Sequence, residues 1–354
     1  MTTTLRSRYE EHAGKVSDKW SIYLDVYQRV FQPFEKEPVR LLEIGVQNGG
    51  GLEIWARHFR NGRQFVGCDI DPRCAALRFD DPRISVVVAD ANSDEAEQAI
   101  ASACERFDIV IDDGSHVSSD IVKSFARYFP RLVEGGVFLA EDLHCSYWRE
   151  FGGGLFDPMS SIAFFKRLAD VVNHEHWGVA GARGDVLRSF FDGYGCSMDE
   201  EVLSTIHSVE FCNSICVVRK ESAARNVLGE RTFAGASGIV SSDRPSGQSH
   251  MFTPAQTDNP WSQLDLAASS EEESQRAVHE RTVSHLATEL ARLTRELTQK
   301  NEHAAGLELE IAGLQGEVLG LRSELDEERS ARSAMEASRS WRLTAPLRAL
   351  RRRF

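Results

Sequence analysis

The sequence predicts an α/β protein whose first 220 residues form a largely parallel sheet, followed by a long C-terminal coiled-coil helix. In the first part, short apolar runs rich in β-branched residues alternate with amphipathic segments. Near-continuous apolar strands of this kind are typical of parallel sheets that helices cover on both faces. Further along the chain, apolar residues recur with a heptad spacing, which predicts the coiled coil.

Five apolar runs are expected to form the parallel strands, in the order VRLLEIGV, QFVGCDI, ISVVVAD, FDIVIDD and GVFLAED. The amphipathic segments LEIWARHF, SDEAEQAIASACERF and SSDIVKSFARYFPRL predict the helices between them. Two last runs, IHSVEF and ICVVRK, lie on either side of Cys212–Ser214 and predict a closing hairpin. Ligands bind beyond the C-terminal ends of the strands in such sheets, and the acids of this sequence follow those ends.

The rest of the chain divides into three segments. Residues 221–270 are rich in Gly, Ser and Pro and predict a flexible linker. Residues 271–338 carry the heptad repeat and predict a coiled coil through which the chain associates with itself. A single amphipathic helix packed on the core is the alternative, but a 3.5-residue period would rotate so long an apolar stripe off any globular surface. The spacing alternates strictly between three and four residues at Val283, Leu286, Leu290, Leu293, Leu297, Lys300, Ala304, Leu307, Ile311, Leu314, Val318, Leu321, Leu325, Glu328, Arg332 and Met335.

The charge balance is acidic, except at the C-terminal end. The 354 residues carry a formal net charge of −13, which argues against a nucleic-acid partner, because such binding needs a basic face. Residues 339–354 contain six Arg and no acid. They predict a basic amphipathic tail that contacts an anionic membrane surface or a partner protein, with a frayed end of the coiled coil as the alternative.

The cysteine pattern and the absence of apolar targeting signals predict a cytoplasmic protein. Seven Cys are scattered without a CxxC pair, as expected for reduced thiols rather than a disulfide framework. The first residues are polar, and no run of about 18 apolar residues predicts a membrane span. The basic tail adds the expectation of peripheral contact with the inner membrane face.

A glycine-rich turn follows the first predicted strand. The segment Leu41–Gly51 reads LLEIGVQNGGG, in which Gly45 and Gly49 let the backbone turn tightly and approach a ligand. Glycine-rich turns also begin purely structural strand–helix units. The spacing differs from the dinucleotide pattern GxGxxG, which weakens a nicotinamide oxidoreductase hypothesis.

Acids end the next two predicted strands. Asp69 can accept hydrogen bonds from both ribose hydroxyls of a nucleoside cofactor. Asp90 is expected beside the adenine of the same cofactor, although the segment can also be a simple helix cap made by Ser93 or Asp94. The turn and the two acids come in the order that a nucleoside site requires.

Four more acids follow the fourth and fifth predicted strands, in FDIVIDDGSH and GGVFLAEDLHCSYW. Clustered carboxylates repel one another, and a divalent cation or hydrogen bonds can offset that repulsion. An all-oxygen set suits Mg²⁺. His116 follows closely, and histidine has a side-chain pKa suited to removing a proton from a hydroxyl. The alternative is that Asp112 or Glu141 only caps a helix or contacts the cofactor.

These motifs resemble a known family. Residues 17–220 are similar to class I S-adenosylmethionine-dependent methyltransferases, with a Rossmann-like seven-stranded sheet, and specifically to the metal-dependent sugar O-methyltransferases of macrolide biosynthesis and the related cephalosporin hydroxylase-like chains. The strings that carry the resemblance are DKW, LLEIGVQNGG, GCDIDP, DDGSH, EDLHCSYW and the glycines at 152–154. The residues SIY after DKW depart from the pattern of the relatives.

The resemblance implies roles for the acids. S-adenosylmethionine would be held by Glu43, Gly45, Gly49 and Asp69, with Asp90 and Asp112 also in its site. Mg²⁺ would be bound by Asp113, Glu141 and Asp142, and His116 would be the general base beside Asp113. Which of Asp112 and Asp113 faces the metal stays open, because adjacent strand residues point in opposite directions.

The insertion at 151–179 combines three glycines with an aromatic-rich helix, which suggests a substrate lid. Tyr147, Trp148 and Trp177 are candidates for stacking on a sugar. For Phe164, Phe165 and Leu168, packing of the helix against the sheet is an equal alternative, and His174 and His176 fit a solvated helix end better than a metal site.

The predicted function is methyl transfer from S-adenosylmethionine to a sugar hydroxyl on a glycan or glycolipid of the bacterial surface. The basic tail also resembles tails of surface-polysaccharide enzymes, so a glycosyltransferase is a candidate partner. One alternative is a macrolide-type sugar methyltransferase acting on a small molecule. Another is a non-catalytic assembly protein whose coiled coil sets the length of a polymer.

Overall fold

The computed structural model describes residues 4–232, 234–235, 253–257, 259, 262 and 271–338. The chain divides into two compact units, residues 1–285 and residues 286–354. The predicted basic tail at 339–354 and most of the predicted linker lie outside the described residues.

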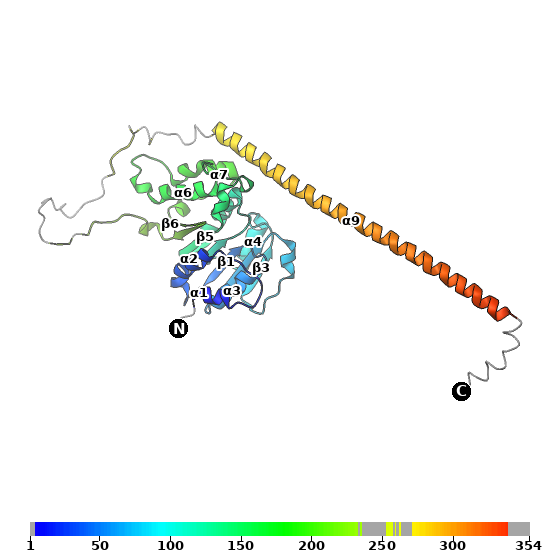
Figure 1. The fold of residues 1–354 in the computed structure, drawn as a ribbon. Coiled ribbons are helices and arrows are strands. Elements are labelled where there is room, and N and C mark those ends of the chain that lie inside the picture. Colours follow the sequence, from blue (N-terminus) through cyan, green and yellow to red (C-terminus); the bar gives the residue numbers. More distant parts are fainter. Residues whose placement is uncertain are drawn as a thin grey trace. The chain divides into compact units, whose positions relative to one another are not determined.

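The first unit contains a seven-stranded sheet with the strand order β3-β2-β1-β4-β5-β7-β6 (Figure 1). The strands β1 to β5 pair in parallel, and β7 lies antiparallel between β5 and β6. This confirms the α/β class, the parallel sheet and the closing hairpin. The strands are β1 (Arg40–Ile44), β2 (Gln64–Asp69), β3 (Ile84–Val88), β4 (Phe107–Asp112), β5 (Leu132–Ala140), β6 (Ile206–Cys212) and β7 (Ile215–Lys220).

Helices cover both faces of the sheet, because successive strand residues are buried on opposite sides. Ile109 and Ile111 of β4 belong to one core, and Val110 between them belongs to the other. The first core packs under α1 (Leu5–Glu10), α2 (Ser21–Phe31) and α3 (Gly50–His58). The second packs under α4 (Asp94–Ala103), α5 (Ser118–Tyr128), α6 (Ser161–Val172) and α7 (Arg188–Tyr194), and a short α8 (Glu200–Leu203) follows (Figure 1).

Serine side chains cap two of these helices, and the cap at Ser93 is one that the sequence predicts. The Ser93 hydroxyl accepts a hydrogen bond from the Ala96 N–H at the start of α4, and Ser160 accepts one from the Ala163 N–H at the start of α6. In α6, Phe164 and Phe165 are fully buried in the second core. The insertion helix therefore packs against the sheet, which confirms the packing alternative for these phenylalanines.

The second unit contains most of α9 (Glu271–Ala337), a helix of 67 residues over the heptad segment. Its length confirms the predicted long C-terminal helix. Among the described residues, no helix is both long and apolar enough to cross a membrane. All seven cysteines are free thiols, and four of them are buried.

Candidate active site

A cleft of about 670 Å³ lies at the C-terminal ends of the parallel strands. It is the place where a doubly wound sheet binds its ligands. Of the residues predicted to hold the cofactor or the metal or to act as base, all but Gly49 line this cleft. The lining includes Glu43, Gly45, Asp69, Asp90, Asp112, Asp113, His116, Glu141 and Asp142.

The glycine-rich turn is required by the fold itself. Gly45 has a φ of +88°, and a Cβ there would lie 1.9 Å from the backbone oxygen of Asp113 on the neighbouring strand end. Gly49 has a φ of +86° and is the residue before α3, where a left-handed conformation begins the helix. The turn thus brings β1 and β4 close together at the base of the cleft.

Asp69 braces this turn. One carboxylate oxygen accepts hydrogen bonds from the N–H groups of Val46 and Gln47, each at 2.8 Å, and the other accepts one from the Asp71 N–H at 2.8 Å. A carboxylate offers about four acceptor positions, so Asp69 keeps limited capacity for a ribose hydroxyl. Its role toward the cofactor stays a prediction.

At the third strand end the helix cap is confirmed, and a place for Asp90 beside adenine stays a prediction. Asp90 lines the cleft and accepts a hydrogen bond from the Asn92 N–H at 2.9 Å, while Ser93 caps α4. The buried Asn92 Oδ1 atom also lines this region and has no hydrogen-bond partner among the described residues. It offers an acceptor to a donor on a bound molecule.

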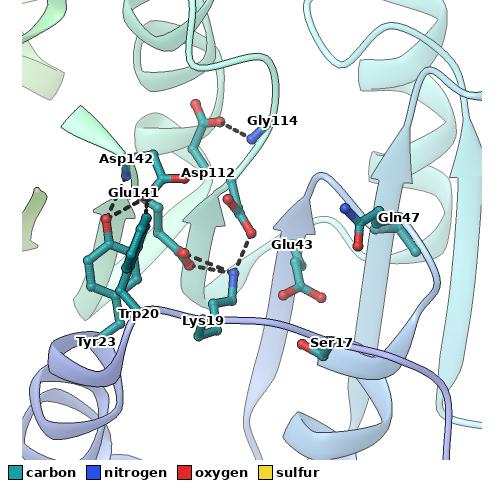
Figure 2. A network of polar contacts seen from close by, with 12 residues as sticks. Ser17, Lys19, Trp20, Tyr23, Glu43, Gln47, Asp112, Gly114, Glu141 and Asp142 are labelled. Carbon is teal, nitrogen blue, oxygen red and sulfur yellow. Dashed lines mark hydrogen bonds and ion pairs between the residues drawn. The ribbon is translucent and has the colours of Figure 1, made fainter. Parts of the chain in front are cut away.

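Asp112 and Asp113 have different surroundings, as expected for adjacent strand residues. Asp112 is buried, and one of its oxygens accepts a hydrogen bond from the Gly114 N–H at 3.2 Å (Figure 2). The other oxygen has no partner among the described residues, and burial raises the pKa of Asp112 to about 7. Asp113 instead faces Lys19, His116 and Asp142. The geometry therefore favours Asp113 over Asp112 at a metal.

Three side chains converge at a position where a cation could bind. Asp113, His116 and Asp142 offer ligand atoms that all lie within 4.8 Å of one another. The His116 Nε2 atom lies 3.6 Å from an Asp142 oxygen. His116 and Asp142 both have positive φ angles, +59° and +53°, a strained backbone that is found disproportionately at functional sites.

Glu141 lies next to these three residues, and its carboxylate is hydrogen-bonded to Lys19 and Tyr27. Lys19 Nζ donates hydrogen bonds to both Glu141 oxygens at 2.9 Å and also to Asp113 (Figure 2). The Tyr27 hydroxyl donates to Glu141 as well. The Glu141 side chain is only 1% exposed, and burial raises its pKa while Lys19 opposes that rise. Direct binding of a metal by Glu141 stays a prediction.

The N-terminal segment holds Asp142 in place. The Tyr23 hydroxyl donates a hydrogen bond to Asp142 Oδ1 at 2.7 Å, and the Trp20 indole N–H donates to the same oxygen at 3.1 Å (Figure 2). Lys19, Trp20 and Tyr23 were not assigned roles from the sequence. The string DKW, which carries part of the family resemblance, was a signal for Lys19 and Trp20, whereas Tyr23 lies in SIY, which departs from the pattern of the relatives.

Glu43 is a third buried acid of the cleft, beside Asp112 and Glu141. The Trp55 indole N–H donates to it at 2.9 Å, and a Cβ on Gly51 would lie 2.6 Å from its carboxylate. Burial raises the pKa of Glu43 to about 7. Both Glu43 and Asp112 are thus poised to change charge near neutral pH.

The aromatic candidates of the insertion do not line the described cleft. Trp148 packs edge-on against His144 and also contacts Phe151. The Trp177 indole N–H donates to the Asp170 carbonyl at the end of α6. Sugar stacking by Trp177, and by Tyr147 and Trp148, which are 39% and 48% exposed, stays a prediction.

The donor set fits the predicted ligands. Two carboxylates, from Asp113 and Asp142, match the one or two that proteins usually offer to Mg²⁺, whose other ligands are waters and substrate oxygens. The open acceptors of Asp112 and Asn92 lie in the same cleft and suit the donor groups of a nucleoside or an amino acid.

Comparison with known proteins agrees with this fold. A methyltransferase domain family matches residues 42–143. The chain is 40% identical over 171 residues to 8-demethyl-8-alpha-L-rhamnosyl tetracenomycin-C 2'-O-methyltransferase of Streptomyces olivaceus, covering 46% of this chain and 44% of that protein. It is 37% identical over 160 residues to mycinamicin VI 2''-O-methyltransferase of Micromonospora griseorubida, covering 42% and 39%. The chain thus spans less than half the length of these curated relatives.

A solved structure is also similar. The MycE methyltransferase from the mycinamycin biosynthetic pathway, in complex with Mg, SAH and mycinamycin VI, superposes with a TM-score of 0.50 and 29% identity, covering 62% of this chain and 53% of that one. Residues 42–143 therefore match a methyltransferase domain, and the seven-stranded sheet with a cleft at its strand ends is similar to that of class I S-adenosylmethionine-dependent methyltransferases.

Proposed function

We propose that this chain is an S-adenosylmethionine- and Mg²⁺-dependent O-methyltransferase that acts on a sugar hydroxyl. The observation that carries the proposal is the convergence of Asp113, His116 and Asp142 in the cleft of a methyltransferase domain. The relatives support the substrate class, since their names describe O-methylation of glycosylated tetracenomycin and mycinamicin.

Different parts of the cleft would hold the two groups. Glu43, Gly45, Asp69, Asp90 and Asp112 would surround S-adenosylmethionine, and Asp113 and Asp142 would hold Mg²⁺, with Glu141 beside them. When bound, S-adenosylmethionine supplies an electrophilic methyl group and Mg²⁺ stabilises negative charge on an oxygen.

Residues of the chain would remove the proton from the acceptor hydroxyl and stabilise the resulting charge. His116 would take that proton as general base, because its ring is accessible in the cleft and lies beside the acids. Asp142 would then stabilise the imidazolium at 3.6 Å. Trp20 and Tyr23 would fix the Asp142 carboxylate by their hydrogen bonds.

The methyltransferase domain and the C-terminal sequence suggest two different classes of methyl acceptor. The relatives favour a sugar on a small polyketide-type molecule. A glycan or glycolipid of the bacterial surface was expected from the C-terminal sequence and has no support from these relatives. A glycosyltransferase partner and contact with an anionic membrane stay predictions, because the basic tail lies outside the described residues.

Methyl transfer from radiolabelled S-adenosylmethionine tests the proposal. The acceptors are a panel of rhamnosylated polyketides and, separately, a bacterial glycolipid extract, each with chelator and with Mg²⁺. We expect label only with Mg²⁺, and full activity in chelator would contradict the metal assignment.

The base assignment has a matched histidine control. His116→Ala should lower kcat by about 10²–10⁴ while calorimetry shows unchanged binding of S-adenosylmethionine. His174→Ala should leave kcat unchanged, because His174 bonds the Gly181 carbonyl away from the cleft. If His116→Ala kept half of the wild-type kcat, His116 would not be the base.

A further inference from the structure

The helix α9 exposes a mostly apolar row, here called the seam, which consists of the heptad positions from Leu290 to Met335 and is interrupted by Lys300, Glu328 and Arg332. Leu297 is 61% exposed and Leu321 is 64% exposed. A helix in water gains little stability from its own backbone, and most helices depend on burying an apolar face. The seam therefore needs a partner surface of the same length.

The residues of the seam fit a two-stranded coil. With Leu290 at heptad position a, Ile311 and Val318 also fall at a, and Leu307, Leu314 and Leu321 fall at d. β-Branched residues at a with Leu at d favour two parallel strands. Seven consecutive seam positions are apolar from Ala304 to Leu325, between Lys300 and Glu328.

The charges beside the seam decide the direction of the partner. In a parallel coil, position g faces position e of the next heptad on the other chain. Glu317 would then face Arg322 of the second copy, and Glu324 would face Arg329. In an antiparallel coil, position g faces g, so the glutamates at 310, 317 and 324 would face one another and repel.

We propose that α9 pairs in parallel and in register with α9 of a second copy of this chain. Two methyltransferase domains are then attached at the same end of a two-stranded coil. Lys300 and Glu328 bound the apolar stretch and oppose slippage of the register, because a shift by one heptad would move a charge into it.

Disulfide trapping in the full chain tests direction and register together. Leu321→Cys places a thiol at d, where it meets its own counterpart only in a parallel, in-register pair. Ser323→Cys is the matched control, because position f points away from the seam. With oxidised glutathione as oxidant, we expect a covalent dimer for Leu321→Cys and none for Ser323→Cys or for the wild type, whose seven cysteines all precede residue 217.

Charge reversal tests the proposed cross-chain pair independently. Glu317→Arg and Arg322→Glu should each raise the dimer Kd about tenfold, because two ion pairs per dimer become repulsions. The double variant should return to within about threefold of wild type, as measured by sedimentation equilibrium. A monomeric or trimeric wild type, no rescue in the double variant, or a dimer without the Leu321→Cys disulfide would overturn the proposal.

Discussion

Lys19 is the residue through which the N-terminal segment reaches the acids of the cleft. Its side chain is 4% exposed and bonds Asp113 and Glu141, which come from the ends of two different strands. Burial lowers the pKa of Lys19, but these carboxylates hold it well above its ordinary value. A charged ammonium thus offsets much of the repulsion among acids that would otherwise be costly to bury.

Removing this ammonium should destabilise the protein strongly. Lys19→Met leaves the buried Glu141 and the partly buried Asp113 carboxylates without their counter-ion, so we expect the free energy of unfolding at pH 8 to fall by about 3 kcal/mol. Urea unfolding followed by circular dichroism measures it. Lys15→Met is the control, because Lys15 pairs with Glu53 at a more exposed site and should cost at most about 1 kcal/mol. Equal losses in the two variants would show that Lys19 does not neutralise the cluster.

At the scale of elements, α3 shows how packing overrides a helix-end preference. His58 is the last residue of α3, where the helix dipole would stabilise a protonated imidazole by up to about 1 kcal/mol. Its ring is buried against Phe31 and Phe59, and neither ring nitrogen has a hydrogen-bond partner among the described residues. Burial lowers the pKa of His58 to about 4, so desolvation outweighs the dipole and the ring stays neutral.

This histidine should make the fold sensitive to mild acid. Between pH 6.5 and pH 4 the unfolded chain binds a proton at His58 that the folded chain does not, so stability falls as pH falls. At pH 5 the loss is about 2 kcal/mol relative to pH 8. His58→Leu should remove that part of the pH dependence, whereas leucine at the exposed His207 should retain it. Urea titrations at both pH values measure the difference, and identical pH profiles for wild type and His58→Leu would contradict it.

At the scale of the whole molecule, the sheet and the seam come from separate parts of the chain. Both hydrophobic cores draw their residues from before residue 219, and the residues of the cleft lie between positions 16 and 142. The seam lies entirely on α9. The proposed methyl transfer and the proposed self-association therefore depend on different parts of the chain.

A chain that ends at residue 232 should keep cofactor binding and lose self-association. It should bind S-adenosylmethionine with wild-type affinity in calorimetry, because it keeps the whole cleft. Sedimentation equilibrium should show a monomer, because it has lost the seam. The Thr253 hydroxyl bonds the Glu175 carbonyl, and loss of this and neighbouring contacts should lower Tm only slightly. A truncated chain that keeps the parent mass would place the association surface on the methyltransferase domain.

The sequence by itself determined the features that repeat at short range. Strand and helix periodicities, the glycine turn at Gly45 and the acids after each strand are local patterns, and they were sufficient for the sheet and for the position of the cleft. The heptads determined α9 for the same reason, because a 3.5-residue period is visible in the sequence itself. Glu43 lies within a strand and was assigned to the cleft only through the family resemblance.

Only the tertiary structure decided how the acids are divided. Lys19 and Tyr27 reach Glu141 across 122 and 114 residues of chain, and this contact depends on how α2 and the segment before it pack against the ends of the strands. The same packing lets the Tyr23 hydroxyl donate a hydrogen bond to Asp142. It also brings Asp142 close to Asp113 and His116. Periodicity sets which face a residue takes within its own element, whereas contacts between distant segments depend on the packing of whole elements, which no local pattern records.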